Sequence, residues 1–330
     1  MGFFSRLFKL ELGIKPVVVA VVGRGSIQQK LLEQAYKNYP LTHLELCCGE
    51  EEIEKVLENP AVELVEIFAP LERRFELAKK CLSYKKHISV DMPPAQASEQ
   101  IRQIQLLAEK NQREVRVRNL LLYYQPYQKA RQLLEQEKIG WVLMLRLTIK
   151  RAIKIRQDFD PAKWLLDKES GSFALVQYLL GDVEKISAIG STNDEGAGTI
   201  LLTMKFKTTH QFGYLLIDFS PQLHIRSTEE KIFRQLWITG TAGVIMVNRA
   251  EGQLWRLPAL ILRAKNYCRT WENLKDNWQD VYFSLAQEAV LVLRKNKKFL
   301  STLKLAEKAL ILTSYAQKSL KENKEVIIQI

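Results

Sequence analysis

The 330 residues are 47% hydrophobic and 26% charged, which is ordinary for a globular chain and favours two domains. Lys and Arg (49) outnumber Asp and Glu (37), and the formal charge of +12 favours anionic partners such as nucleotides, phosphates and carboxylates. No zinc-finger or RNA-recognition pattern, membrane-length apolar run or CxxC pair is present, so nucleic acid, a membrane span and structural zinc are not expected. We therefore expect a reduced, cytoplasmic protein that carries no metal.

Residues 1–15 form an arm ahead of the first predicted strand. If the arm is helical, it could touch a membrane surface or a partner, because one of its sides carries Phe3, Phe4, Leu7 and Phe8. The simpler alternative is that the arm docks on its own protein.

Residues 16–125 predict a Rossmann domain. The run "PVVVAVVG" at 16–23 is continuously apolar and β-branched, as expected of a parallel strand buried on both faces. Strands and helices then alternate, which indicates βαβ units in a doubly wound sheet. We predict strands at 16–23, 41–48, 62–70, 87–91 and 113–121, and helices at 27–39, 50–60, 72–84 and 98–111, with Ser98 as the cap of the last helix.

The turn after the first strand, Gly23-Arg24-Gly25-Ser26, predicts a dinucleotide site. It closes a strand and opens a helix, where backbone N–H groups and the helix dipole can hold a pyrophosphate. Gln28 replaces the third glycine of the GxGxxG pattern, which weakens the match because that glycine serves close helix–strand packing. The alternative is a tight turn that binds no ligand.

The end of the second strand bears on the choice of coenzyme. An acid is expected there for the adenosine ribose of NAD, but Cys48 stands in its place, followed by Gly49 and the acids Glu50 to Glu52. No arginine is present to accept a 2′-phosphate. NAD(H) is therefore slightly preferred over NADP(H).

Residues 126–330 predict a second α/β domain with a largely antiparallel, open sheet. A helix over 126–140 precedes strand-like runs joined by short turns, and a long helix is expected at 301–323. The predicted strands lie at 141–150, 184–192, 199–208, 210–220, 232–241, 243–250 and 325–330.

From residue 16 to 330, the order of elements and several phrases resemble the glucose–fructose oxidoreductase, inositol dehydrogenase and rhizopine-catabolism (Gfo/Idh/MocA) family. The resemblance implies a Rossmann domain followed by an α/β domain, whose open sheet commonly joins copies into homo-oligomers. It also implies hydride transfer between NAD(P)(H) and a sugar or polyol. Besides the glycine turn, the phrases are "VELVEIFAP", "CLSYKKHISVDMPPA", "YYQPY", "KIGWV", "LLGDVEKISAIG" and "ITGTAG".

Two departures from the family affect its catalytic groups. Where the family usually has Glu-Lys-Pro, with the lysine reaching the reacting hydroxyl, this chain has Asp91, Met92 and Pro93. A thioether cannot move a proton or hold a positive charge at neutral pH, so the lysine's role is vacant. The family's inward helix carries an Asp and then a His, whereas the segment after Gly171 is shorter here, with Gln177 near the acid's place and no histidine after it.

The resemblance also implies positions for the site. Asp91, Tyr123 and Tyr124 are candidates for a substitute proton donor. Alternatively, Asp91 caps a helix or turn beside the prolines, and the two tyrosines pack in the core. Arg74 could meet a phosphate or carboxylate, or lie solvated on a helix face. The positions implied for the cofactor are Gly23, Arg24, Gly25, Ser26, Ile27, Cys48, Ala69, Pro70, Arg74, Asp91 and Pro93.

The segment "RLTIKRAIKIR" at 146–156 carries a different signal. As a strand it would place four cations on one face and aliphatic side chains on the other. An anionic substrate or the acids of a partner could bind there, although a solvated face over a buried one explains the pattern equally well. The four cations are Arg146, Lys150, Lys154 and Arg156.

Three functions remain open. The one we favour is an NAD(P)-binding member of this oxidoreductase family that is degenerate for sugar and polyol dehydrogenation. The second is an active NAD(P)H-dependent reductase of an anionic carbonyl or enone with a rearranged site, since the coenzyme itself supplies the hydride. The third is a non-enzymatic scaffold that binds anions or a membrane.

Overall fold

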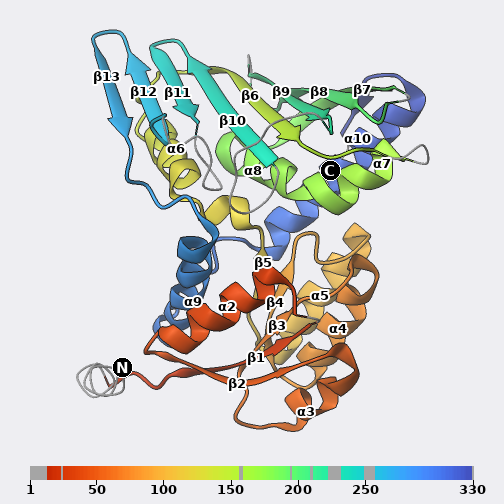
Figure 1. Cartoon of the computed structure of the whole chain (residues 1–330), viewed down its shortest axis with the longest axis vertical. Helices are drawn as coiled ribbons and strands as arrows, with labels where there is room; N and C mark the ends of the chain where they lie inside the picture. Colours follow the sequence, from red (N-terminus) through yellow and green to blue (C-terminus); the bar gives the residue numbers. More distant parts are fainter. Residues whose placement is uncertain are drawn as a thin grey trace. The chain divides into compact units, whose positions relative to one another are not determined.

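The computed structural model describes residues 13–23, 25–155, 159–193, 195–208, 211–221, 232–248 and 257–328 (Figure 1). The arm expected over residues 1–15 lies almost wholly outside the described residues. The chain divides into two compact units. Unit 1 comprises the chain up to Leu120 together with Trp278–Glu307, and unit 2 comprises Leu121–Asn277 together with Lys308–Ile330. The sequence predicts a single boundary near residue 125. The division differs from this prediction because a segment from late in the chain completes unit 1.

Unit 1 is built on a parallel five-stranded sheet in the order β2-β1-β3-β4-β5. The inner strands β1, β3 and β4 consist largely of apolar or β-branched residues and are buried on both faces, as parallel strands between helical layers must be. The strands are β1 (Val17–Val22), β2 (Thr42–Cys48), β3 (Leu64–Ile67), β4 (His87–Asp91) and β5 (Val115–Arg118).

Helices cover this sheet on both faces (Figure 1). α2 (Ile27–Asn38) and α9 (Trp278–Lys295) pack on each other and on β1, and α4 (Leu71–Ser83) packs on α5 (Ser98–Asn111). The short α3 (Ile53–Glu58) follows a 3₁₀ turn. The predicted doubly wound Rossmann sheet is thereby confirmed.

Two features of these helices differ from the sequence prediction. α9 was not predicted, although its buried residues Trp278, Val281, Leu285 and Ala289 recur at helical spacing. Ser98 is the first helical residue of α5 and not its cap. The Gln100 side chain closes this end instead, because its Oε1 accepts hydrogen bonds from the N–H groups of residues 96 (3.1 Å) and 97 (3.2 Å).

Unit 2 contains a nine-stranded sheet in the order β13-β12-β11-β10-β6-β9-β8-β7-β14. Every neighbouring pair is antiparallel except β6 and β9, so the predicted largely antiparallel sheet is confirmed. The strands are β6 (Val142–Arg151), β7 (Val183–Thr192), β8 (Gly198–Phe206), β9 (Phe212–Phe219), β10 (Ile232–Gly240), β11 (Gly243–Val247), β12 (Leu260–Ala264), β13 (Tyr267–Trp271) and β14 (Val326–Ile327).

The described helices of unit 2 lie on one face of this sheet (Figure 1). The inward side chains of β6, Leu145, Leu147 and Ile149, are buried as predicted, and the alternate residues of the strand are only partly covered. The helices are α6 (Gln125–Glu135), α7 (Pro161–Trp164), α8 (Ser170–Leu180) and α10 (Leu303–Glu322).

Candidate functional site

The predicted cofactor residues of unit 1 gather at one edge of the parallel sheet. Val22, the last residue of β1, is in register with Cys48 of β2 and with Ile67 of β3, and Ile67 is in register with Val90 of β4. The carboxyl ends of parallel strands meet at such an edge, and open α/β sheets bind ligands there. The edge therefore unites the glycine turn, Cys48, Ala69, Pro70 and Asp91.

The turn after β1 needs both of its glycines. A Cβ atom on Gly23 would lie 2.7 Å from Cβ and 2.9 Å from the backbone oxygen of Phe68, so only glycine lets the ends of β1 and β3 approach this closely. Gly25 has a φ of +77°, in the left-handed region that favours glycine. Arg24, between them, lies outside the described residues.

The start of α2 is capped from within the turn. Ser26 Oγ accepts a hydrogen bond from the N–H of Gln29 at 3.1 Å, and Gln29 Oε1 accepts one from the N–H of Gly25 at 2.8 Å. Ile27 is 66% exposed. Gln29 was not among the predicted site residues. Its signal in the sequence is its place one turn after the glycines, where a long side chain can reach back to them.

The end of β2 offers no free acid at the expected place. Burial raises the pKa of the Cys48 thiol, and Glu52 raises it further, so the thiol is protonated at neutral pH. The nearest downstream acid, Glu50, pairs with Arg73 at 3.3 Å. The slight preference for NAD(H) over NADP(H) therefore stays a prediction from the sequence.

Asp91 at the end of β4 is held by a buried arginine. Nε and Nη2 of Arg118, from the end of β5, donate to Asp91 Oδ1 at 3.0 and 2.8 Å, and the guanidinium carbon of Arg118 lies 3.9 Å from the ring centroid of Phe68. Arg118 also pairs with Glu66, which is fully buried on β3. Asp91 thus belongs to an ion network, and its expected alternative, a cap beside the prolines, is not what the structure has.

Arg74 ties together the two loops that frame this edge. Its side chain donates to the backbone oxygens of Ala69 at 3.0 Å and Pro93 at 2.8 Å, and it lies 3.9 Å from Asp91. It is largely buried, so the alternative of a solvated helix-face arginine is wrong. Its position indicates that it fixes the loops after β3 and β4.

The remaining predicted site residues belong to unit 2. Tyr123 and Tyr124 are 4% and 1% exposed, as core packing predicts, and the ring of Tyr124 meets Tyr127 edge-on at 6.5 Å. Gln177, near the place of the family's acid, is buried in α8. All three side chains are therefore buried within unit 2.

A buried ion cluster lies at the start of α8. Burial raises the pKa of Glu169, but Arg151 and Arg234 outweigh this effect and hold the pKa below its usual range. Ser172 donates to the same carboxylate. Two inward arginines of the sheet thus share one acid of the chain itself as a partner.

Of the predicted cations that the structure describes, Arg146 and Lys150 share a face of β6. β6 ends at Arg151, so Lys154 lies beyond the strand, and Arg156 lies outside the described residues. The Arg146 guanidinium stacks over Trp237 of the neighbouring strand at 5.4 Å. Lys150 is in register with Asp218 of β9. The cation face of the described strand therefore comprises Arg146 and Lys150, and Arg146 stacks on Trp237.

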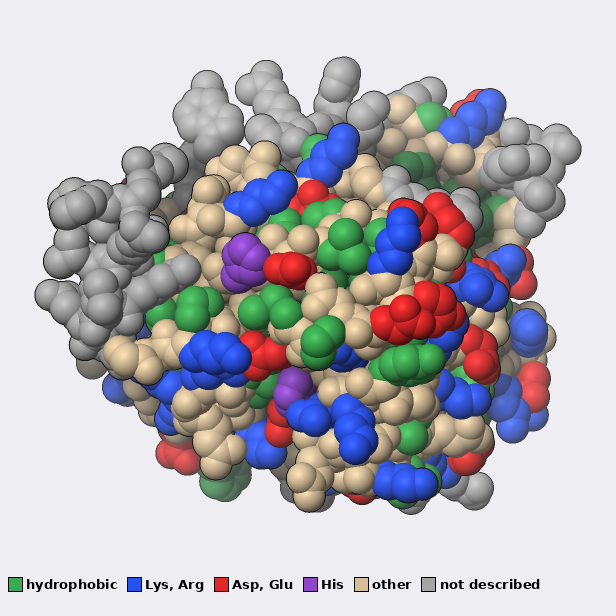
Figure 2. Space-filling view, turned by 90° about the horizontal axis from the view of Figure 1, so that it is seen from below, with side chains coloured by type: hydrophobic (Ala, Val, Ile, Leu, Met, Phe, Trp, Pro, Cys, Tyr) green, Lys and Arg blue, Asp and Glu red, His purple; other side chains and the backbone are tan. Residues whose placement is uncertain are grey.

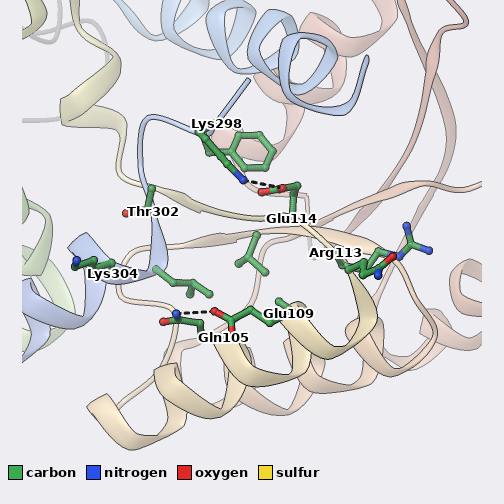
Figure 3. Close-up of a pocket in the computed structure, with 12 residues that line it drawn as sticks. Gln105, Glu109, Arg113, Glu114, Lys298, Thr302 and Lys304 are labelled. Carbon is green, nitrogen blue, oxygen red and sulfur yellow. Dashed lines mark hydrogen bonds and ion pairs between the residues drawn. The ribbon is translucent and has the colours of Figure 1, made fainter. Parts of the chain in front are cut away.

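A hollow of about 410 Å³ lies beside the edge strand β5 (Figure 3). Lys298 and Glu114 of its lining lie 3.5 Å apart, and Gln105 donates to Glu109 at 2.9 Å. Cations and acids thus share its lining.

The positive charge is not gathered into a single patch on the face that Figure 2 shows, where basic and acidic side chains are interspersed. Surface cations of unit 1 pair with acids, as Lys80 does with Glu54 and Lys55 with Glu52. Among the described residues no group of three or more His, Cys, Asp or Glu is placed to hold a metal ion. No described helix is both long and apolar enough to cross a membrane.

Comparison with known proteins agrees with this geometry. The model of the oxidoreductase family with an NAD-binding Rossmann fold (Gfo/Idh/MocA) matches residues 43–119. No curated protein matches the chain.

Solved structures share the fold over nearly the whole chain. A putative NADPH-dependent oxidoreductase from Desulfitobacterium hafniense has a TM-score of 0.78 at 18% identity, covering 95% of this chain and 98% of its own. An oxidoreductase from Agrobacterium radiobacter, in complex with NAD+, L-tartaric acid and magnesium, has 0.76 at 15% identity, covering 95% and 99%. Levoglucosan dehydrogenase, in complex with NADH and levoglucosan, has 0.76 at 15% identity, covering 96% and 100%. The resemblance of this chain to the Gfo/Idh/MocA oxidoreductases is thereby confirmed, in the matched segment 43–119 and in the fold of both units.

Proposed function

We propose that this chain binds a nicotinamide dinucleotide at the carboxyl edge of its parallel sheet and has lost the usual dehydrogenation of sugars and polyols. The turn between β1 and α2 carries the proposal, because Gly23 and Gly25 bring the backbone and the N-terminus of a twelve-residue helix to that edge. The matched family model and the coenzymes named with the solved relatives support it.

The residues present fit a dinucleotide in part. The pyrophosphate would lie against the backbone of the turn, the adenosine ribose beside Cys48, and the nicotinamide toward the end of β4. When bound, the coenzyme supplies or accepts the hydride, and the protein has to orient it and manage a proton. The residues proposed to hold it are Gly23, Arg24, Gly25, Ser26, Ile27, Cys48, Ala69, Pro70, Asp91 and Pro93, with Arg74 bracing the loops, and NAD(H) remains slightly preferred.

Three observations support the loss of the usual chemistry. Met92 stands where the family has its lysine and cannot transfer a proton. Asp91 is engaged by Arg118, and the shortened α8 carries Gln177 near the place of the family's acid. The usual acid–base groups are therefore replaced, whereas the cofactor edge is retained.

A reductase with a rearranged site is the second candidate. One observation favours it: the Asp91 side chain is 25% exposed at the cofactor edge, within reach of solvent. Such a reductase would take its proton from Asp91, Tyr123 or Tyr124, and an anionic carbonyl or enone would suit the cations Arg146 and Lys150.

Titration with NADH and NADPH, followed by fluorescence and by thermal shift, tests the proposal. We expect binding without turnover across a panel of sugars, polyols, carbonyls and enones. NAD(P)H consumption with a carbonyl or enone would favour the reductase. No binding of either coenzyme at millimolar concentration, together with salt-sensitive binding to anionic vesicles, would favour a scaffold.

A pair of glycine variants locates the site. Gly25→Ala and Gly181→Ala both place a Cβ at a positive φ, +77° and +86°, in otherwise open space, so both are expected to cost about 1–3 kcal/mol of stability. Only Gly25→Ala is expected to weaken NADH binding, by about tenfold, because a side chain there keeps the backbone from the pyrophosphate. Equal affinities of the two variants would place the coenzyme elsewhere.

A further inference from the structure

The side chain of Gln29 reaches back from the first turn of α2 to both glycines of the β1–α2 turn. Its Oε1 accepts a hydrogen bond from the Gly25 N–H at 2.8 Å. The same oxygen lies 2.6 Å from where a Cβ of Gly23 would stand, so it fills the space that the missing side chain leaves. The amide oxygen of Gln29 thus occupies the space beside the backbone that the two glycines leave open.

This side chain is fixed at both ends. Gln29 Nε2 donates to Glu33 Oε1 at 2.9 Å, and the backbone N–H of Gln29 donates to Ser26 Oγ at 3.1 Å. Gln29 is only 4% exposed. Buried and bonded through both side-chain polar atoms, it has no need of solvent to satisfy them.

A backbone N–H offers one hydrogen, and an amide oxygen accepts it in the way that a phosphate oxygen would. The Glu33 carboxylate lies behind the amide of Gln29. Its negative charge would repel an incoming pyrophosphate once the Gln29 side chain moves. We propose that Gln29 is an internal occupant of the dinucleotide turn, which competes with the pyrophosphate and must swing out before a coenzyme binds. The inference rests on the proposed function, because it concerns access to that same site.

The competition lowers affinity by the free energy needed to release the Gln29 side chain. A net hydrogen bond of ordinary strength corresponds to a factor of about three to ten in affinity. We therefore expect Gln29→Ala to bind NADH and inorganic pyrophosphate about three- to tenfold more tightly than the wild type. Gln29→Glu should bind both more weakly, because a carboxylate accepts the Gly25 N–H more strongly and repels phosphate.

The experiment is isothermal titration of the full chain with NADH and, separately, with inorganic pyrophosphate. Gln34→Ala is the matched control, since Gln34 is exposed on the same helix and distant from the turn. Amide exchange of Gly25, measured by NMR on protein labelled with ¹⁵N-glycine, reports the contact without any ligand. It should be faster in Gln29→Ala than in the wild type and unchanged in Gln34→Ala.

Tighter binding by Gln29→Ala, weaker binding by Gln29→Glu and an unchanged control support the proposal. Equal NADH affinity in Gln29→Ala and the wild type overturns it and leaves the proposed function standing. Tighter pyrophosphate binding by Gln29→Ala, without NADH binding to any variant, supports it while the proposed function fails. No detectable binding of either probe overturns both. If Gln29→Ala does not fold, Gln29→Glu decides, and affinity equal to or above that of the wild type overturns the proposal.

Discussion

Arg118 changes the electrostatic environment at the end of β4. It brings a buried positive charge to Asp91, next to the position where Met92 has replaced the family's lysine. Burial lowers the pKa of Arg118, but Asp91 and Glu66 outweigh it, so the pKa lies above its usual value. A guanidinium in that state supplies an electrostatic field and gives up no proton, in keeping with a site that binds more than it catalyses.

His87, also in β4, gives unit 1 a pH dependence. Burial, reinforced by Arg113, lowers its pKa from 6.5 to about 4, while its Nδ1 accepts a hydrogen bond from the Glu114 N–H at 2.9 Å. The pKa of His87 is lower in the folded state than in the unfolded state, so the unfolded chain takes up a proton first as the pH falls. The free energy of unfolding is therefore highest above pH 6.5 and decreases as the pH falls toward 4. The loss is at most about 3 kcal/mol.

We expect the free energy of unfolding of the wild type to fall relative to that of His87→Gln between pH 7 and pH 4.5. Urea unfolding followed by circular dichroism at several pH values measures this difference. A difference that stays constant with pH would show that the pKa of His87 is the same in the folded and unfolded states.

At the scale of elements, a buried ion network ties β3, β4 and β5 to α9. Glu66 on β3 accepts from Arg116 and Arg118 of β5, and Arg116 also donates to Ser89 Oγ at 3.0 Å and to the backbone oxygen of Leu285 in α9 at 2.6 Å. Burial raises the pKa of Glu66, but the two arginines outweigh it and the pKa lies below its usual range.

Glu66→Gln leaves two buried guanidinium groups without their shared carboxylate and is expected to cost about 3–5 kcal/mol. Glu54→Gln is the control, because it removes a half-exposed ion pair with Lys80 and should cost less than about 1 kcal/mol. Urea unfolding at pH 7 measures both. A loss below 1 kcal/mol for Glu66→Gln would mean that the arginines find other partners.

The periodic elements could be predicted from the sequence, because the β-branched run of β1 and the amphipathic α2 carry their own signals. The ion network could have been suspected, since Arg116 and Arg118 recur at the two-residue period within a buried strand. The pairing of those arginines with Glu66 could not, because it depends on the strand order β3-β4-β5. Gln29 escaped prediction for a similar reason: its role depends on a side chain that folds back to the turn.

At the scale of the whole molecule, the sheet of unit 2 has one face that the described helices leave open (Figure 1). Leu216 lies on it, in register with Leu201 of β8 and Thr148 of β6, and all three are partly exposed. We propose that two or more copies associate through this face, because burying apolar side chains such as Leu201 and Leu216 between sheets is favourable.

Leu216→Lys should reduce the mass in solution to that of one 38.2 kDa chain. Leu106→Lys, at a leucine of α5 that is 66% exposed, should leave the mass of the wild type unchanged. Light scattering after size-exclusion chromatography measures the mass of the wild type and of both variants. A wild type that already has the mass of a single chain would rule out this association.

The late position of α9 has a consequence for biosynthesis. Residues 278–307 complete unit 1 and residues 308–330 complete unit 2, so both units depend on residues that are translated after residue 277. A ribosome adds about 5–20 residues per second, and during that time β1 and α2 stand outside the exit tunnel with their apolar sides uncovered. A nascent chain of this protein therefore has to be shielded, by its own collapse or by a chaperone, until residues 278–307 have emerged, and a chain that terminates before residue 278 has neither unit intact.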